Sequence, residues 1–184
     1  VVCGLTHKLF TLTGTGEADD FQQCDKCVDV LLDYLNSRDS LREAAVAFRD
    51  EDNSTLFHSV FYGHAPRVRI AGWAERLFSM GFDPYVPLRN ETNGQRPLDM
   101  IIGHLHLKLA EQTVNPAVVN YYEYNQYWRG ANTLQRLLKT YATAKDSETL
   151  VKVHQMVKIL VNSNINLEFT DADGLSITDY LSEY

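Results

Sequence analysis

The sequence predicts an all-α fold: a helical solenoid of repeated turn-and-helix units, preceded by an N-terminal helical extension. Two observations predict this fold. Apolar residues recur at spacings of three and four in several segments, which is the pattern of an amphipathic helix. Similar turn-then-helix stretches also recur along the chain, which is typical of repeat architectures. Alternating runs typical of strands are few. The clearest of them, residues 105–109, lies among helical patterns, so we expect a helix there as well.

Four segments carry the helical pattern most clearly. Residues 26–37 place apolar side chains on one helical face, and residues 41–48 are rich in alanine, a strong helix former. Residues 71–80 end before a glycine, which is a typical C-terminal cap. Residues 147–163 have the most regular amphipathic pattern, and Ser147 is placed where an N-cap residue belongs.

Length, composition and charge limit the class of protein. The 184 residues, of which 45% are hydrophobic and 22% charged, are enough for one ordinary globular domain and exclude wholesale disorder. No stretch approaches the roughly 20 apolar residues that span a bilayer. Lys and Arg number 17 against 24 Asp and Glu, a balance of 17 − 24 = −7 without a basic stripe. We therefore expect neither nucleic acid nor an anionic membrane as a partner. Because the chain starts at Val1 rather than at an initiator methionine, we expect it to be a segment of a longer protein.

Three short stretches of the sequence resemble one another. Each begins with a turn-forming pair of residues and then enters a helix through a polar residue followed by hydrophobic ones, so each is predicted to form a turn immediately before a helix. Two further segments share an apolar helix end, then Asn or Gly, then Asp or Asn. The turn stretches are residues 52–60, 93–101 and 173–181, with turns predicted at 52–55, 93–96 and 173–176, and the helix ends are residues 76–84 and 158–167.

These stretches resemble the ankyrin repeat family, whose unit is a β-turn and two helices with a T-P-L-H-x-A signature. Residues 55–58 (TLFH) match that signature except for the proline, residues 96–99 (RPLD) keep the proline and leucine, and residues 176–179 (SITD) are the most divergent. The second-helix exit of the family is matched by residues 81–84 (GFDP) and 164–167 (NINL). The resemblance implies a binding domain of stacked units in which the Thr and His of the signature are structural, because they hydrogen-bond the turn.

The spacing of the units departs from that of the family. The resemblance covers residues 50–102 and 147–184, and the matching signature positions lie 99 − 58 = 41 and 179 − 99 = 80 residues apart, against about 33 in the family. We therefore expect an N-terminal arm and helical extension over residues 1–49 and divergent ankyrin-like repeats over residues 50–184. Residues 105–146 would be either an insertion or a degenerate repeat.

The cysteines leave two alternatives open. The odd set Cys3, Cys24 and Cys27 does not indicate a disulfide framework, so we expect a reducing, intracellular setting. With His7, these thiols could form a tetrahedral zinc site, which would make the chain a zinc-stabilised regulatory module. Only the CxxC half of this set has a common ligand spacing, and a redox CxxC would need a βαβ setting. We expect ordinary thiols, with no metal or other cofactor.

No residue pattern indicates an enzyme. Residues 13–17 (TGTGE) lack the Lys-Ser/Thr end of a phosphate-binding loop and are interpreted as a linker. His104 and His106, two positions apart on a predicted helix, would point about 200° apart and could not share a metal ion. The sequence contains neither a nucleophile elbow nor a zinc-protease motif. We therefore expect no catalysis and no small-molecule substrate. A small helical enzyme with an acidic pocket is the competing hypothesis.

The predicted function is protein–protein interaction, as an intracellular binding module or scaffold. In a stacked repeat array, the turn tips and first helices form an extended concave surface. The tips of this chain are mostly acidic, which favours a basic partner. The candidate partner-binding residues at the tips are Asp50, Glu51, Asp52, Arg89, Asn90, Glu91, Asp171 and Asp173.

An aromatic run at residues 121–128 is the other candidate contact surface. Four Tyr and one Trp in eight residues exceed what one face of a core helix uses. Such residues are enriched at interface hot spots because they combine apolar area with a polar group. The alternative is that they fill space left by the irregular spacing of the units. The candidate residues are Tyr121, Tyr122, Tyr124, Tyr127 and Trp128.

Overall fold

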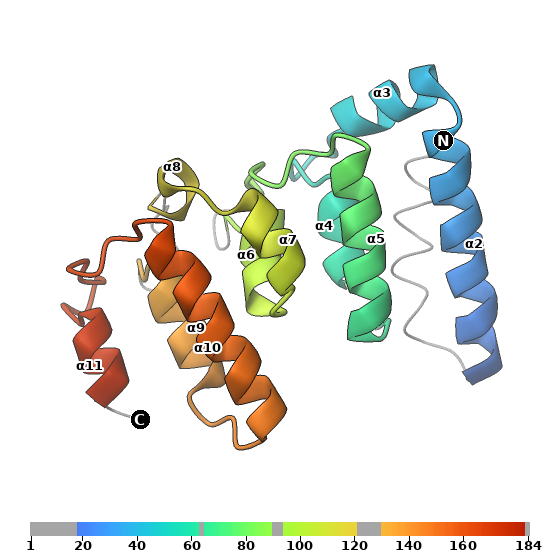
Figure 1. The fold of residues 1–184 in the computed structure, drawn as a ribbon. Coiled ribbons are helices and arrows are strands. Elements are labelled where there is room, and N and C mark those ends of the chain that lie inside the picture. Colours follow the sequence, from blue (N-terminus) through green and yellow to red (C-terminus); the bar gives the residue numbers. More distant parts are fainter. Residues whose placement is uncertain (1–17, 63–64, 90–93, 121–129, 183–184) are drawn as a thin grey trace. The chain divides into compact units, whose positions relative to one another are not determined.

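The protein is all-helical over the residues that its computed structural model describes, as predicted (Figure 1). Within this part of the chain the β-structure is confined to an isolated bridge between Thr170 and Ser176. None of the described helices combines the length and the apolar character that a membrane crossing requires. The described residues are 18–62, 65–89, 94–120 and 130–182, with side chains from residue 26 onward.

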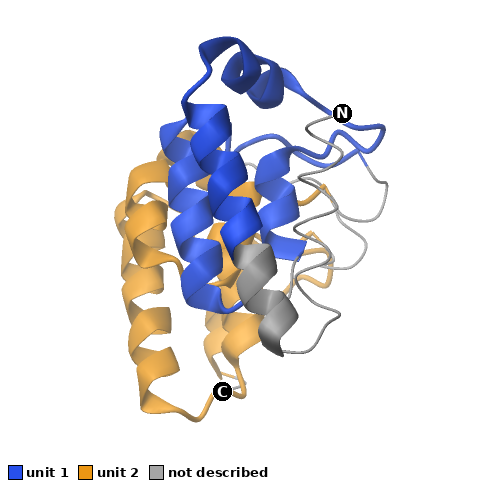
Figure 2. Cartoon of the chain, turned by 90° about the vertical axis from the view of Figure 1, so that its right-hand side faces the viewer, with its two compact units in different colours: residues 1–89 blue, residues 90–184 orange. Residues whose placement is uncertain are grey.

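The chain divides into two compact units, residues 1–89 and residues 90–184 (Figure 2). The first unit contains α2 (Ala18–Asn36), α3 (Asp39–Ala47), α4 (Leu56–Tyr62) and α5 (Arg67–Ser79). The second contains α6 (Pro97–Gly103), α7 (Leu107–Thr113), α8 (Pro116–Val119), α9 (Thr133–Tyr141), α10 (Ser147–Asn162) and α11 (Ile177–Ser182).

All four segments with a helical pattern form helices. α2 and α3 cover nearly all of residues 26–37 and 41–48, and α5 begins at Arg67, before the predicted segment 71–80. Gly81 ends α5 with a φ of 94°, in the left-handed region where glycine is favoured, as predicted.

The start of α10 differs from the prediction in its capping residue. The helix spans Ser147–Asn162, but its N-cap is Asp146 rather than Ser147. The Asp146 carboxylate accepts the backbone N–H of Thr149 at 2.7 Å. Aspartate and serine are both strong N-cap residues, so the sequence allows either one to cap the helix. The cap is Asp146 because its side chain accepts the unpaired N–H of Thr149.

The helix predicted across residues 105–109 is wrong at its first two positions. Leu105 has a φ of 60°, a left-handed conformation that ends α6, and α7 begins only at Leu107. The N–H of His106 closes this turn on the carbonyl oxygen of Ile101 at 3.0 Å. The alternating pattern therefore comes from a helix end followed directly by a new helix start.

In the first unit, α5 packs against both α2 and α4. Val28, Leu32 and Leu35 of α2 are fully buried or nearly so. The Asp29 carboxylate accepts hydrogen bonds from three α5 side chains that share one helical face. They are Arg69 at 2.6 Å, Trp73 Nε1 at 3.0 Å and Arg76 at 3.0 Å. This contact fixes the N-terminal extension helix to α5.

In the second unit, α6 contacts α7 and α9, and α9 contacts α10 and α11. Fully buried leucine and isoleucine side chains fill the space between them, among them Leu98, Ile101 and Leu134. Two polar contacts add to this packing. The Tyr141 hydroxyl donates to the carbonyl oxygen of Gly103 at 2.6 Å and joins α9 to α6. The fully buried Gln135 binds backbone carbonyls of the loop before α11.

Candidate partner-binding face

Four of the described helices, α4, α6, α9 and α11, begin in the same way. The residue before the helix donates its backbone N–H to the side chain three positions later, at 2.7–3.1 Å. In α4, α9 and α11 the later residue also donates its own N–H back to the first side chain, at 2.9–3.4 Å, which makes a reciprocal capping box. The pairs are Thr55 with His58, Arg96 with Asp99, Asn132 with Gln135, and Ser176 with Asp179.

A residue with left-handed backbone lies two positions before each of these caps. Asn and Gly are the residues that adopt this conformation at low cost, and these two residue types occupy the four positions. Turns precede α4 and α11 as predicted, but their backbone hydrogen bonds join residues 50 to 53 and 171 to 174, both at 3.0 Å, two residues earlier than the predicted 52–55 and 173–176. Of the turn predicted at residues 93–96, Asn93 lies outside the described residues. The φ angles are 62° at Asn53, 38° at Gly94, 74° at Gly130 and 76° at Gly174.

The cap of α9 lies within residues 105–146, where the sequence shows no match to the family signature. Residues 132–135 read NTLQ, which contains neither the proline nor the His or Asp of the other stretches. Asn132 and Gln135 nevertheless exchange two hydrogen bonds of 2.8 and 2.9 Å, as the other pairs do. The signal that could have found them is a glycine two positions before a residue pair able to form a capping box.

The segments that follow α5, α7 and α10 also share a hydrogen-bonded turn. In each of three such segments, an Asp or Asn side chain accepts the backbone N–H of the residue two positions later, at 2.8–3.1 Å. After α7 the same bond is the N-cap of α8, whose first residues follow Asn115 directly. The other two bonds lie within the predicted exits. The residues are Asp83, Asn115 and Asn166.

Two of the acidic candidates at the turn tips, Asp50 and Asp171, hold their own turns together. Each carboxylate accepts two backbone N–H groups, from the residues two and four positions further along, at 2.7–3.0 Å. Asp171 also accepts the hydroxyl of Tyr180 at 2.7 Å and is only 7% exposed. These contacts give both carboxylates a role in holding their own turns.

Other candidates at the tips are exposed. Glu51, Asp52, Arg89 and Asp173 lie at the surface, and the N–H of Arg89 donates to the carbonyl oxygen of Asp52 at 2.8 Å. This bond brings two of the predicted tips of the first unit together. The candidates Asn90, Glu91, Tyr121, Tyr122, Tyr124, Tyr127 and Trp128 lie outside the described residues.

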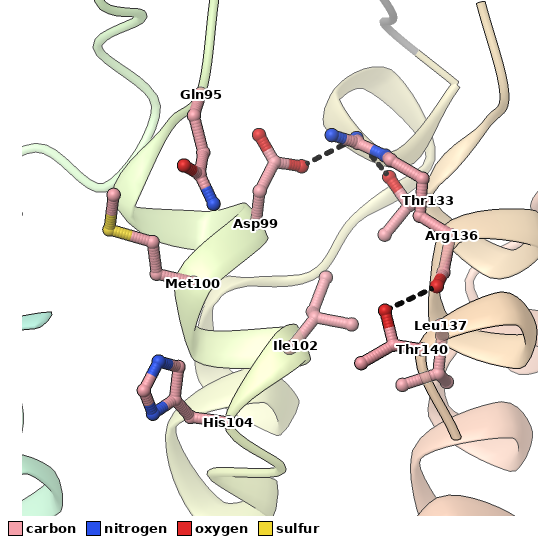
Figure 3. A pocket seen from close by; sticks show the side chains of 10 residues that line it. Gln95, Asp99, Met100, Ile102, His104, Thr133, Arg136, Leu137 and Thr140 are labelled. Carbon is pink, nitrogen blue, oxygen red and sulfur yellow. Dashed lines mark hydrogen bonds and ion pairs between the residues drawn. The ribbon is translucent and has the colours of Figure 1, made fainter. Parts of the chain in front are cut away.

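A cleft lies between α6 and α9 (Figure 3). Its volume is about 230 Å³. The α6 side contributes Asp99 and Gly103, which are four positions apart and so lie on one helical face, and Gln95, which precedes the helix. The α9 side contributes Thr133, Arg136, Leu137 and Thr140, and Met100, Ile102 and His104 complete the lining.

A buried ion cluster lies at the end of this cleft. The Asp99 side chain, 6% exposed, binds Arg96 of its own capping pair at 3.0 Å and Arg136 of α9 at 2.8 Å. Burial alone would raise the pKa of Asp99, but the two guanidinium groups outweigh burial and lower the pKa to about 2. Among the described residues, the cluster therefore contains two guanidinium groups and one carboxylate.

Arg136 uses only part of its guanidinium group in this cluster. Both of its side-chain hydrogen bonds within the described residues leave from Nη2, to Asp99 Oδ1 at 2.8 Å and to Thr133 Oγ1 at 3.4 Å (Figure 3). Its Nε is buried, and no acceptor among the described residues binds it.

The two histidines considered as metal ligands do not lie on one helix. His104 follows α6 and His106 precedes α7, so the argument from a 200° separation does not apply. Their rings stack with centroids 5.8 Å apart and an angle of 17° between the planes. Among the described residues, no group of three or more His, Cys, Asp and Glu side chains could hold a metal ion.

The candidate zinc ligands lie largely outside the described side chains. Cys27 is described and exposed, whereas Cys3, His7 and the side chain of Cys24 are not described. We expect purified protein to contain no stoichiometric zinc, since only the CxxC half has a common ligand spacing. Elemental analysis measures this directly. About one zinc per chain, lost in the Cys24→Ser variant, would contradict the expectation and favour the zinc-stabilised module.

No protein-family model matches the chain, and no curated protein matches it either.

Proposed function

We propose that the chain is an intracellular protein-binding module, built of four divergent ankyrin-like units of which the last contributes its first helix. The observation that carries this proposal is the fourfold recurrence of a left-handed residue, a capping pair and a helix. Successive caps lie 96 − 55 = 41, 132 − 96 = 36 and 176 − 132 = 44 residues apart. The cap of α9 supports a degenerate repeat, rather than an insertion, over residues 105–146.

The cleft between α6 and α9 supports a binding function over catalysis. At about 230 Å³ it lies below the roughly 300–1,000 Å³ of typical small-molecule sites. Its one carboxylate, Asp99, has a pKa of about 2 and is held by two arginines. An efficient general acid or base has a pKa near the working pH, so Asp99 is poorly suited to that role. A small cleft between α6 and α9 is better suited to binding a segment of another protein than to catalysis.

The partner is proposed to carry basic residues. Glu51, Asp52 and Asp173 are exposed acidic side chains at turn tips, and the chain has a net charge of −7. Complementary charge speeds the encounter of two proteins and favours specific pairs, more than it adds affinity.

Selection of peptides from a displayed random library on the immobilised chain tests the proposal. We expect enriched peptides that bind the folded chain with micromolar or better affinity. The Gly103→Leu variant should weaken them at least about tenfold, because Gly103 lines the cleft and a side chain added there meets open space. Isothermal titration calorimetry of each peptide measures the change.

A matched control separates filling of the cleft from the effect of a leucine as such. Gly72, in α5, also has open space around an added side chain. Gly72→Leu should therefore leave binding unchanged. Failure of any peptide to enrich would refute the binding module. Peptides that bind the Gly103→Leu variant normally would refute the cleft as the binding surface.

The aromatic run is tested with the same peptides. Trp128→Ala should weaken binding more than Asp52→Ala, because truncating a buried interface aromatic commonly costs about 2 kcal/mol or more and a rim charge much less. Normal affinity in a folded Trp128→Ala variant would assign the run to another role.

A further inference from the structure

We propose that one exposed face of α10 docks an acidic amphipathic helix of another protein. This face, the outward stripe, covers about 100° of the helix circumference, on the side away from the buried Met156 and Leu160. It shares no residue with the cleft between α6 and α9, so it is a second contact surface. The residues of the outward stripe are Leu150, Val151, His154, Lys158 and Val161.

The apolar residues of the outward stripe are exposed together. Leu150 is 46% exposed, Val151 58% and Val161 40%. The helices that pack against α10 are α7 and α9, and the residues of α10 that are buried lie on the opposite side of the helix. No residue of α6, α7, α8 or α9 exposes a large apolar side chain to this extent. Exposed apolar side chains that gather on one surface typically mark a contact with another molecule.

The charge of the outward stripe favours an acidic partner. The chain as a whole has 24 acidic against 17 basic side chains, yet the stripe contains a lysine and a histidine and no carboxylate. Glu148, the one carboxylate of α10, binds Lys152 at 2.6 Å, away from the stripe. Lys158 is positively charged, and His154 offers an N–H donor in either tautomer. Carboxylates of a partner would complement both groups.

The spacing of the outward stripe fits a helical partner. Leu150 and Val161 are 161 − 150 = 11 positions apart, which is about 16 Å along the helix axis, or three turns. A partner helix with apolar side chains at spacings of three and four can pack them against these residues, as the ridges of one helix fill the grooves of another. Three turns of helix bury less surface than a stable interface needs, so we expect weak and reversible binding.

Two matched peptides test this inference. Both are capped helical peptides of roughly 18 residues with Leu at heptad positions a and d, and they differ in having Glu or Lys at the flanking positions e and g. The Glu peptide, titrated to roughly 1 mM, should shift the amide NMR signals of α10 in the folded chain in a saturable way. The Lys peptide should bind at least about tenfold more weakly, because it places like charges beside Lys158.

Substitutions of exposed residues locate the contact. Val151→Asp should weaken binding of the Glu peptide at least about tenfold, because it removes apolar area and adds a like charge. The matched control is Val68→Asp in α5, where the valine is 76% exposed, and it should leave binding unchanged. Both positions are at the surface, so the fold should be retained in both variants. Lys158→Glu should reverse the preference toward the Lys peptide.

Each other outcome overturns a defined part of the inference. Equal affinity for the two peptides, or an unchanged preference in Lys158→Glu, would refute the acidic character of the partner. Shifts centred outside α10, or normal binding to Val151→Asp, would refute the outward stripe as the contact. Absence of a saturable shift would refute the docking surface. Binding to vesicles with roughly 30% phosphatidylserine, without saturable binding of the Glu peptide, would assign the stripe to an anionic membrane and overturn the proposal.

Discussion

Replacing Asp99 with Asn is expected to lower the free energy of unfolding by about 3–5 kcal/mol at neutral pH. The Asp99 side chain is 6% exposed and is shared by Arg96 and Arg136. Asparagine keeps its shape but not its charge, so two guanidinium groups would remain buried beside a neutral amide. Urea-induced unfolding of the wild type and the variant at about pH 7 measures the difference.

Asp179 provides the matched control for Asp99. It occupies the equivalent capping position of α11, three residues after Ser176, but it is exposed and its carboxylate pairs with no arginine in the described structure. Asp179→Asn keeps an oxygen acceptor for the cap and should change stability far less. A loss at Asp99 no larger than the loss at Asp179 would show that the ion cluster contributes little.

The same cluster predicts a pH dependence. The pKa of Asp99 is about 2 in the folded protein, below its ordinary value of 3.8. Its ionisation therefore contributes stability above about pH 4, on the order of 2 kcal/mol, and this contribution is lost as the pH falls toward 2. The stability difference between the wild type and Asp99→Asn should accordingly narrow between about pH 5 and pH 2. A constant difference would contradict the lowered pKa.

Replacing Gln135 with Met is expected to lower the free energy of unfolding of the second compact unit, residues 90–184, by about 3 kcal/mol. The reason is that each buried polar group left unpaired costs about 1–3 kcal/mol. Gln135 is fully buried and accepts the N–H of Asn132 at 2.8 Å. Its Nε2 donates to the carbonyl oxygens of Phe169 at 3.3 Å and Leu175 at 2.8 Å. Methionine has the same length but can make none of these bonds.

Hydrogen exchange distinguishes this role from general loss of stability. The contacts of Gln135 hold the loop before α11, so the amide of Tyr180 in α11 should lose more protection than amides of α10. Gln155→Met, at an exposed position of α10, is the matched control and should change neither stability nor exchange appreciably. Uniform loss of protection over the unit would contradict a local role.

Much of the fold could be predicted from hydrophobic spacing and turn residues. Residues 147–163 and 71–80 form helices because their apolar side chains share one face, and Gly81 ends a helix because glycine adopts left-handed backbone readily. The helix cap at Asn132 escaped prediction because NTLQ shares its hydrogen-bonding chemistry with a TPLH-type signature, but only the leucine in the sequence itself. Asn and Gln form the same two bonds as Ser and Asp, so the equivalence is visible in geometry and not in residue identity.

The candidate site was less accessible to sequence reasoning. Asp99 and Arg136 are 37 positions apart, and only the packing of α6 on α9 brings their side chains to 2.8 Å. Acidic residues at the turn tips also have two different roles. Asp50 and Asp171 accept hydrogen bonds from nearby backbone N–H groups, whereas Glu51 and Asp173 are exposed to solvent. The sequence does not distinguish the two roles, because acidic residues of both kinds lie in or next to a turn.

The local hydrogen bonds at each helix start determine where the chain can accept inserted residues. At the start of α4, the turn and the capping pair exchange their backbone hydrogen bonds within nine residues, from Asp50, which accepts the N–H of Ser54, to His58, which accepts the N–H of Thr55. Residues inserted between the helices leave these bonds intact, and doubling the length of a flexible loop costs only about 0.6 kcal/mol. Insertions of several residues at 143–145, between α9 and the Asp146 cap of α10, should therefore be tolerated. Exchanging Gly130 or Gly174 for a β-branched residue should not be tolerated, because each has positive φ. Descendants of such a chain would drift in period while keeping Gly or Asn at the four left-handed positions.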